Sequence, residues 1–120
     1  RILKASPSEQ VTLTQKMEMI DRYIENNVYG KVSLDKIASY VGMNRTYFCL
    51  FFKKHYGRGF ADYLNDIRVD KAASLLTDRD KKIAEIAREC GFKTAPYFTR
   101  AFRRSRGMSP AEFRKKALNR

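Results

Sequence analysis

The chain has 120 residues, 43% of them apolar, which is long enough for one compact domain or two very small ones. Its 25 lysines and arginines against 13 acids give a formal charge of +12, a surplus that folding does not require and that favours a polyanionic partner. Nucleic acid and an anionic membrane surface are the two candidates. No run approaches the roughly 18 apolar residues that a membrane span needs, so we expect a soluble protein without a membrane partner.

The cysteines and the histidine carry no sign of metal or redox chemistry. Cys49 and Cys90 stand in apolar patterns without a CxxC pair, and His55 is the one histidine of the sequence. We therefore expect no metal and no cofactor, and a reducing, cytoplasmic location. The sequence also offers no carboxylate pair, activated nucleophile or phosphate-cradling loop, so we do not expect an enzyme.

The N-terminal segment differs in character from the rest. Residues 1–13 are polar and aperiodic and are predicted to form a linker or tail, followed by a folded domain over 14–118. Without an initiator methionine or an apolar signal segment, the beginning of the chain favours a piece cut from a longer protein.

The first helix is predicted just after this segment, with Thr14 as its N-cap and Gly30 at its end. Apolar residues at helical spacing define it: Met17, Ile20, Ile24 and Val28. No stretch of the sequence alternates with period two over a useful length. The whole chain is therefore predicted to be all-α.

Two short helices come next. One is predicted from the cap Ser33 to Gly42, and the other, "RTYFCLFFKKHY", ends at Gly57, with a turn of about three residues between them. Two short helices joined by a tight glycine turn are typical of a helix-turn-helix unit, here at about 34–56. A long linking helix is predicted at about 60–76.

The pattern of this unit then recurs. Residues Ile83, Ile86, Ala87 and Cys90 repeat, 49 positions later, the spacing of Leu34, Ile37, Ala38 and Val41. After a one-residue insertion, Tyr97, Phe98, Phe102, Arg103, Arg104 and Gly107 repeat Tyr47, Phe48, Phe52, Lys53, Lys54 and Gly57. These coincidences predict an internal duplication, with a second helix-turn-helix at about 83–106. A short basic seventh helix is predicted after the cap Ser109, with Pro110 and Glu112 in its first turn.

The second helix of each unit is predicted to bury its aromatic residues and to offer the opposite face to the major groove of DNA. In the later unit, we expect Arg100 to bond a guanine edge and Thr99 to contact a thymine methyl or a base edge. Ala95 and Pro96 offer small apolar contacts near the helix start. Phosphate contacts are expected from Lys93, Thr94, Arg103, Arg104 and Arg106.

The earlier unit has a less polar face. Its candidate base readers are Asn44, Arg45, Thr46, Cys49 and Leu50, and its candidate phosphate contacts are Lys53 and Lys54. Because Cys49 and Leu50 can offer only apolar contact, we expect weaker or methyl-based readout from this unit. A linking helix of about 17 residues spans roughly 25 Å. That length suits two reading helices in successive major grooves, about 34 Å apart.

At this point the sequence resembles a known family. The stretches "LDKIASYVGMNRTYFCLFFKKHYGRGFADYLNDIRVDKAASLL" and "IAEIARECGFKTAPYFTRAFRRSRGMSPAEFR" are similar to the DNA-binding domain of AraC/XylS transcription regulators across residues 15–116. The resemblance implies seven helices in two homeodomain-like helix-turn-helix subdomains that bind asymmetric sites in double-stranded promoter DNA. It also implies regulation of transcription with RNA polymerase as a partner; we expect an activator, and repression stays open as the alternative. The base readers that it implies are Thr46, Cys49, Leu50, Ala95, Pro96, Thr99 and Arg100.

Two details refine the resemblance. Lys82 stands where family members commonly place a capping serine. The stretch "YIENNVYGKVSLDKIA" resembles the output domains of two-component regulators, which implies an N-terminal effector or receiver domain. A different class of function remains open at this point, namely a module whose helix-turn-helix units dock protein or RNA. Steep salt dependence on a specific duplex would favour the regulator.

Overall fold

The computed structural model describes residues 12–119 of the chain, and this part contains seven α-helices and no strand. The helices are α2 (Leu13–Asn27), α3 (Leu34–Tyr40), α4 (Arg45–Tyr56), α5 (Phe60–Leu75), α6 (Ile83–Glu89), α7 (Ala95–Arg106) and α8 (Pro110–Leu118). The prediction of an all-α chain with seven helices is confirmed for the described residues. Most of the predicted N-terminal linker, residues 1–11, lies outside them.

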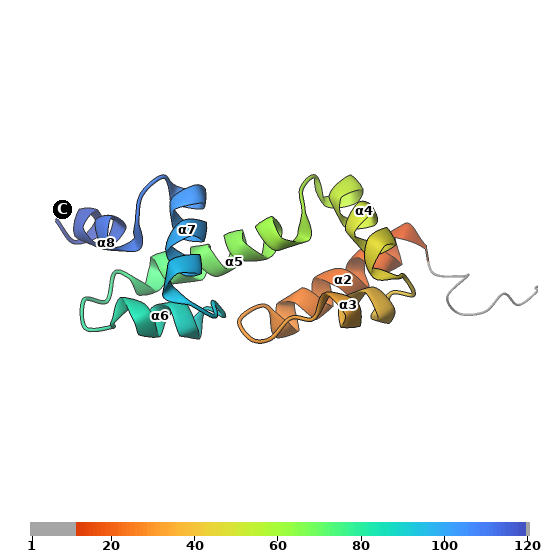
Figure 1. Cartoon of the computed structure of the whole chain (residues 1–120), viewed down its shortest axis with the longest axis horizontal. Helices are drawn as coiled ribbons and strands as arrows, with labels where there is room; N and C mark the ends of the chain where they lie inside the picture. Colours follow the sequence, from red (N-terminus) through yellow and green to blue (C-terminus); the bar gives the residue numbers. More distant parts are fainter. Residues whose placement is uncertain (1–11, 120) are drawn as a thin grey trace, which may run out of the picture. The chain divides into compact units, whose positions relative to one another are not determined.

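The described chain divides into two compact units (Figure 1). The first unit comprises residues 12–27 and 32–59 and contains α2, α3 and α4. The second comprises residues 28–31 and 60–119 and contains α5 to α8. The short segment 28–31 thus packs with the second unit, although it lies between α2 and α3 in the sequence.

In the first unit, α3 and α4 form the predicted helix-turn-helix. The hydroxyl of Ser33 accepts from the Lys36 amide at 3.2 Å and caps α3, as predicted. Gly42 in the turn and Gly57 after α4 both have positive φ, which glycine adopts without steric cost. The buried apolar residues of this unit are Ile20, Ile24, Ile37, Ala38, Val41, Met43, Phe48, Phe51 and Phe52.

The ends of α2 differ from the prediction. The helix begins at Leu13 because Thr12 caps it: the Thr12 hydroxyl accepts from the Gln15 amide at 3.1 Å, and the Gln15 side chain accepts from the Thr12 amide at 2.9 Å. The prediction of Thr14 as the cap is therefore wrong, since Thr14 lies inside the helix. The helix ends at Asn27 rather than Gly30, and Val28 is buried in the second unit.

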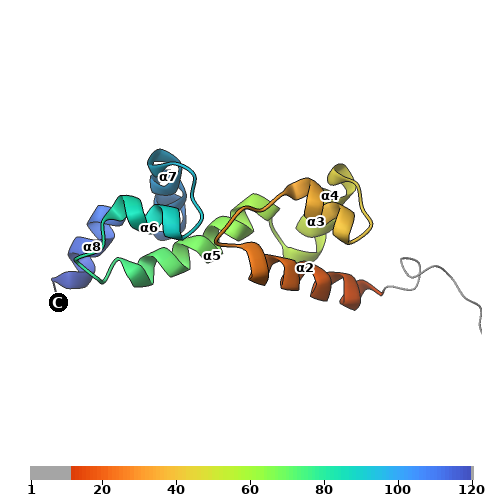
Figure 2. The ribbon, with the colours of Figure 1, turned by 90° about the horizontal axis from the view of Figure 1, so that it is seen from below.

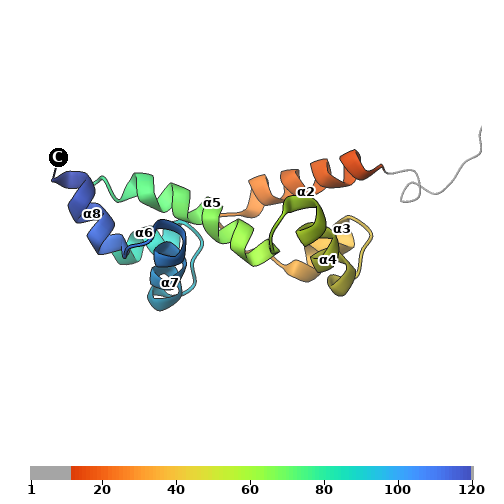
Figure 3. The same ribbon diagram turned by 90° about the horizontal axis from the view of Figure 1, so that it is seen from above.

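In the second unit, α7 packs across α5, and α6 lies alongside both of them (Figures 1 and 2). The C-terminal helix α8 contacts α5 and α7 (Figure 3). The core is a single apolar cluster of Val69, Ala72, Ala73, Leu76, Ile86, Ala87, Cys90, Phe92, Phe98, Ala101 and Phe102. This cluster fixes the face of α7 that points inward, and so the face that remains exposed.

The two units repeat the same local structure. Helices α3 and α6 have seven residues each, and α4 and α7 have twelve residues each. Asn44 caps α4 and Thr94 caps α7, and in both cases the side-chain oxygen accepts from a tyrosine amide three residues later. The predicted duplication is therefore confirmed at the level of the helices.

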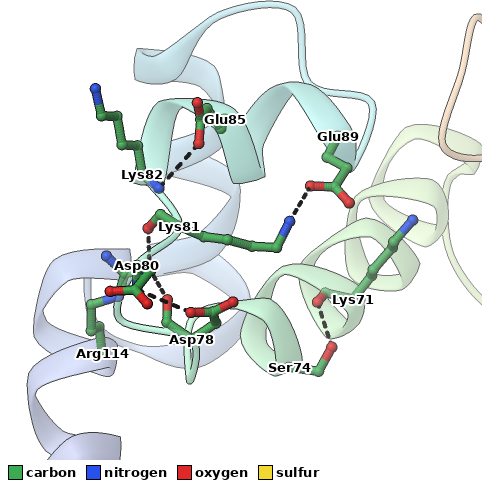
Figure 4. Close-up of polar contacts among 9 residues, drawn as sticks. All are labelled: Lys71, Ser74, Asp78, Asp80, Lys81, Lys82, Glu85, Glu89 and Arg114. Atoms are coloured by element: carbon green, nitrogen blue, oxygen red, sulfur yellow. Dashed lines mark hydrogen bonds and ion pairs between the residues drawn. The ribbon is translucent and has the colours of Figure 1, made fainter.

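Side chains from α6 and α8 hold the turn between α5 and α6 (Figure 4). The guanidinium of Arg114 donates to the carbonyls of Leu76, Asp78 and Lys81 at 3.0, 3.0 and 2.6 Å. Lys82 precedes α6, and because its side chain has no acceptor, only half of a capping box forms, with the Glu85 carboxylate accepting from the Lys82 amide at 3.4 Å.

The seventh helix has the complete capping box that the sequence predicts. Ser109 Oγ accepts from the Glu112 amide at 3.1 Å, and the Glu112 carboxylate accepts from the Ser109 amide at 2.8 Å. These hydrogen bonds to Ser109 lower the pKa of Glu112 below its ordinary value. Pro110 occupies the first turn of α8, where its missing N–H costs no helical hydrogen bond.

A buried arginine of α5 holds the segment 28–31. Arg68 Nε donates to the carbonyl of Val28 at 2.6 Å, and its Nη2 donates to the carbonyl of Gly30 at 3.3 Å. Burial lowers the pKa of Arg68, while the nearby Tyr97 and Cys90 act in the opposite direction. The ring of Phe92 lies 5.9 Å from the guanidinium carbon.

Candidate nucleic-acid interface

Helix α7 has one buried and one exposed face, as predicted. Phe98, Ala101 and Phe102 are buried in the core of the second unit. Among the predicted base readers on this helix, Ala95, Pro96 and Arg100 are exposed, whereas Thr99 is half-buried. Thr99 therefore lies at the edge of the exposed face and not at its centre.

The start of α7 is stabilised by an N-cap and by a proline in the first turn. Thr94 Oγ1 accepts from the Tyr97 amide at 3.2 Å, so its hydroxyl oxygen already serves as the cap. Pro96 stands in the first turn, where its fixed φ suits the helix and no N–H is lost. The predicted phosphate contacts near this end, Lys93 and Thr94, are both exposed.

Two of the predicted phosphate contacts are paired with carboxylates of α5. Arg104 Nη1 lies 3.5 Å from Asp62 Oδ1, and both side chains are largely exposed. An exposed pair of this kind contributes about 0–1 kcal/mol, so Arg104 can exchange Asp62 for a phosphate. Arg106 Nη2 donates to Asp70 Oδ1 at 2.6 Å, and its guanidinium lies 5.9 Å from the ring of Phe113.

Arg106 is therefore held more firmly than Arg104. Its side chain is 31% exposed, against 77% for Arg104. A part-buried arginine that packs on an aromatic ring contributes to the attachment of α7 to α5 and α8. Arg103, on the same turn, is exposed.

Arg100 rests over an aromatic ring. Its guanidinium carbon lies 5.9 Å from the centroid of Tyr97, within the range of a cation–π contact. The phenol oxygen of Tyr97 in turn accepts from Nδ2 of Asn65 on α5 at 2.9 Å. Sequence reasoning did not find Asn65, because the residue lies 32 positions away on another helix.

The exposed face of α4 is largely apolar. Phe48, Phe51 and Phe52 are buried, and Thr46, Cys49 and Leu50 are exposed on the other side, with Leu50 at 66%. Lys53 and Lys54 are exposed in the last turn, where positive charge also suits the helix dipole.

Two polar base-reading candidates of the first unit, Asn44 and Arg45, already have partners within the protein. Asn44 Oδ1 accepts from the Tyr47 amide at 2.8 Å, which leaves the amide nitrogen of Asn44 as a donor. Arg45 Nε lies 3.0 Å from Asp35 Oδ1 of α3, in an exposed ion pair. The polar groups at the start of α4 are therefore engaged within the protein, so the exposed face of α4 is less available for polar contacts than its sequence indicates.

The described residues contain no group of three or more side chains suited to hold a metal ion. No helix within residues 12–119 is long and apolar enough to cross a membrane.

Comparison with known proteins identifies this arrangement. A family model described as "Helix-turn-helix domain", of the AraC type, matches residues 37–116. The chain belongs to this AraC-type family. A protein named "Probable transcriptional regulator LumQ", of Photobacterium leiognathi, is 34% identical over 97 residues, which are 81% of this chain and 39% of LumQ. The chain thus spans well under half the length of LumQ, and it covers 33% of the regulatory protein PocR of Salmonella typhimurium and 35% of YijO of Escherichia coli.

Solved AraC-type structures share the fold. The C-terminal domain of the two-component response regulator yesN from Fusobacterium nucleatum is 30% identical, with a TM-score of 0.75 over 82% of this chain and 96% of that chain. The DNA-binding domain of AdpA, a global transcriptional factor solved in complex with a target DNA, is 28% identical, with a TM-score of 0.73 over 84% of this chain and 90% of that chain. The family and these relatives are transcriptional regulators.

Proposed function

We propose that this chain binds double-stranded DNA sequence-specifically, as the DNA-binding part of a bacterial transcription regulator. The observation that carries the proposal is the repeated helix-turn-helix, whose second helix buries its aromatic face and exposes the opposite one. The positive charge of the chain, and the AraC-type relative solved with its target DNA, support the same conclusion.

The two reading helices have different tasks in this proposal. Helix α7 discriminates, because Arg100 is exposed on the face opposite the core, beside the small residues Ala95 and Pro96. Helix α4 offers Cys49 and Leu50, which suit thymine methyl groups, and Thr46, which can contact a thymine methyl or a base edge. The two helices enter successive major grooves. Phosphates are contacted by Lys53, Lys54, Lys93, Arg103 and Arg104, with smaller roles for Thr94 and Arg106.

The wider setting of the domain is also proposed. The AraC-type domain covers about residues 14–118 and contacts RNA polymerase. The full protein is a cytoplasmic activator, and it has no catalytic activity. The likeness to the C-terminal domain of a response regulator supports an N-terminal receiver or effector domain. The matched residues make up only 39% of LumQ, which leaves room in a relative of that length for such an additional domain.

Selection of bound sites from a pool of random duplex DNA tests the function directly. We expect an asymmetric consensus with two half-sites about one helical turn apart, and an affinity that falls steeply as salt rises. Arginine and lysine contacts release one counterion each, so the salt slope counts them. Enrichment of no duplex sequence, or binding that does not depend on the duplex sequence, would favour a module that docks protein or RNA.

The substitution Arg100→Ala should relax sequence choice. We expect a loss of about 1–3 kcal/mol at one base pair of the selected site and almost none on random duplex, because a bidentate contact to guanine carries sequence information. Arg104→Ala is the matched control on the same helix. It should weaken selected and random duplexes equally and reduce the salt slope by about one. Titration of each variant against both duplexes gives the answer, and equal losses for Arg100→Ala would contradict its assignment as a reader.

The natural cysteines report on the α4 face without any mutation. Cys49 is exposed, whereas Cys90 is buried, and its burial raises the pKa of the thiol, so only Cys49 should react with a thiol-directed alkylating reagent. With the selected duplex at roughly ten times its Kd, alkylation of Cys49 should be about tenfold slower. Mass spectrometry of the time course measures both sites. An unchanged rate on saturating duplex would remove Cys49 from the interface.

A further inference from the structure

Tyr97 is held from two sides at the start of α7. Its ring packs edge-on against the buried ring of Phe92, with centroids 6.0 Å apart, and its phenol oxygen accepts from Asn65 Nδ2 at 2.9 Å. The residue is nevertheless 37% exposed. A large aromatic side chain that is anchored and still reaches solvent, on the turn that carries the predicted base readers, has a fixed position from which to meet a ligand.

The hydrogen bond from Asn65 leaves the phenol proton available. A phenol has one O–H donor as well as lone pairs that accept, and the Asn65 amide occupies one of the lone pairs. Within residues 12–119, the Tyr97 hydroxyl accepts this hydrogen bond and donates none. A hydroxyl that already accepts a hydrogen bond is polarised and becomes a better donor.

The surroundings of Tyr97 indicate what accepts that proton. Lys93 is exposed just before the helix, and Arg100 lies over the Tyr97 ring with its guanidinium carbon 5.9 Å from the centroid. Positive charge around an unshared donor favours an anionic acceptor. In a DNA complex the abundant anionic acceptors are backbone phosphate oxygens, which tyrosine hydroxyls commonly contact.

The first unit provides an internal comparison. Tyr47 occupies the matching position on α4 and is 53% exposed. Its ring contacts Phe51, with centroids 6.3 Å apart, and within the described residues its hydroxyl has no hydrogen-bond partner. The anchoring from a neighbouring helix is therefore particular to Tyr97.

We propose that Tyr97 is itself a DNA contact: its hydroxyl donates to a backbone phosphate, while its ring holds Arg100 over the base edge that this arginine reads. Asn65 is the positioning residue, because it orients the phenol from α5 without touching DNA. This inference rests on the proposed function and adds a contact that links the phosphate grip of α7 to its base reading.

The substitution Tyr97→Phe removes the hydroxyl and keeps the ring. We expect it to weaken selected and random duplexes alike, by about threefold to tenfold, because one hydrogen bond to a phosphate is lost. The salt slope should stay unchanged, since no cation is removed. Tyr47→Phe is the matched control and should bind as the wild type does. Tyr97→Leu, which also removes the ring, should in addition relax the preference at the base pair read by Arg100.

Asn65 is tested by a double-mutant cycle. Asn65→Ala should weaken binding by about twofold to threefold through loss of orientation, and the double variant Asn65→Ala with Tyr97→Phe should bind no more weakly than Tyr97→Phe alone. Additive losses would overturn the positioning role. Thermal unfolding of each variant shows whether a loss of affinity comes from unfolded protein.

A duplex with single neutral methylphosphonates tests the phosphate contact on the unmodified protein. At one position in the selected site, the substitution should weaken the wild type by the same factor as Tyr97→Phe and should not weaken Tyr97→Phe further. If no position shows this coupling, Tyr97 only ties α7 to α5 and the inference fails. If the wild type selects no duplex at all, the proposed function fails first, so the two failures are distinguishable.

Discussion

Gly91→Ala is expected to destabilise the second unit by about 2–5 kcal/mol, whereas Gly42→Ala, the matching change in the first unit, should cost about 1–2 kcal/mol. Both glycines follow the first helix of a helix-turn-helix, and both have positive φ, +96° at Gly91 and +76° at Gly42. The left-handed conformation alone destabilises any residue with a Cβ. This cost is common to both sites and accounts for the loss of about 1–2 kcal/mol expected for Gly42→Ala.

The larger figure comes from the neighbours of Gly91. A Cβ there would lie 2.9 Å from Arg68 Nε, 3.1 Å from the carbonyl carbon of Tyr29 and 3.1 Å from the carbonyl oxygen of Val28. Two of these atoms belong to the backbone, and the third makes a 2.6 Å hydrogen bond, so none can move away at low cost. Beyond the adjoining residues of the chain, a Cβ at Gly42 would meet no heavy atom within 4 Å.

Denaturant unfolding of the two variants, followed by circular dichroism and tyrosine fluorescence, measures the difference. The chain has no tryptophan and seven tyrosines, so the fluorescence signal is intrinsic. Gly57→Ala serves as a further control, since φ is +84° and the surrounding space is open. If Gly91→Ala and Gly42→Ala cost the same, the close approach of segment 28–31 to this turn does not contribute to stability.

Local patterns in the sequence predicted most of the fold. The periodicity of apolar residues and the capping signals at Ser33 and Ser109 depend on residues a few positions apart, and both were confirmed. The error at Thr14 has a local cause too. The sequence "TLTQ" contains the signature of a capping box, Thr12 with Gln15. The predicted start was placed too late because it was based on the periodic apolar residues, which begin only at Met17.

The candidate site was less predictable, because its side chains meet partners that are distant in the sequence. The three acids Asp62, Asp66 and Asp70 are visible as a stripe on α5, but the pairing of two of them with Arg104 and Arg106 spans 42 and 36 positions. The exposed faces of α4 and α7 follow from helical spacing. Helical spacing does not show which of their charged side chains already form ion pairs within the protein. It also gives no sign of Asn65, which lies on another helix.

Arg68→Met is expected to lower the stability of the second unit by about 1.5–3 kcal/mol, the usual contribution of a hydrogen bond to a charged group. Methionine keeps most of the length and volume of the side chain but cannot donate, so the carbonyls of Val28 and Gly30 lose their partner. The control is Arg88→Met on α6, where the arginine is exposed and the change should stay within about 0.5 kcal/mol.

The sign of this effect is a real test, because burying a charge is costly. Desolvation lowers the pKa of Arg68, which shows that the protein environment disfavours its charged form, and replacing buried charges with apolar side chains stabilises some proteins by about 1–4 kcal/mol. Here two backbone carbonyls and the ring of Phe92 compensate the charge, and methionine would bury the Val28 carbonyl without a donor. Unfolding in denaturant measures the balance. A more stable Arg68→Met variant would mean that the arginine is retained to fix segment 28–31 in place, at a net cost in stability.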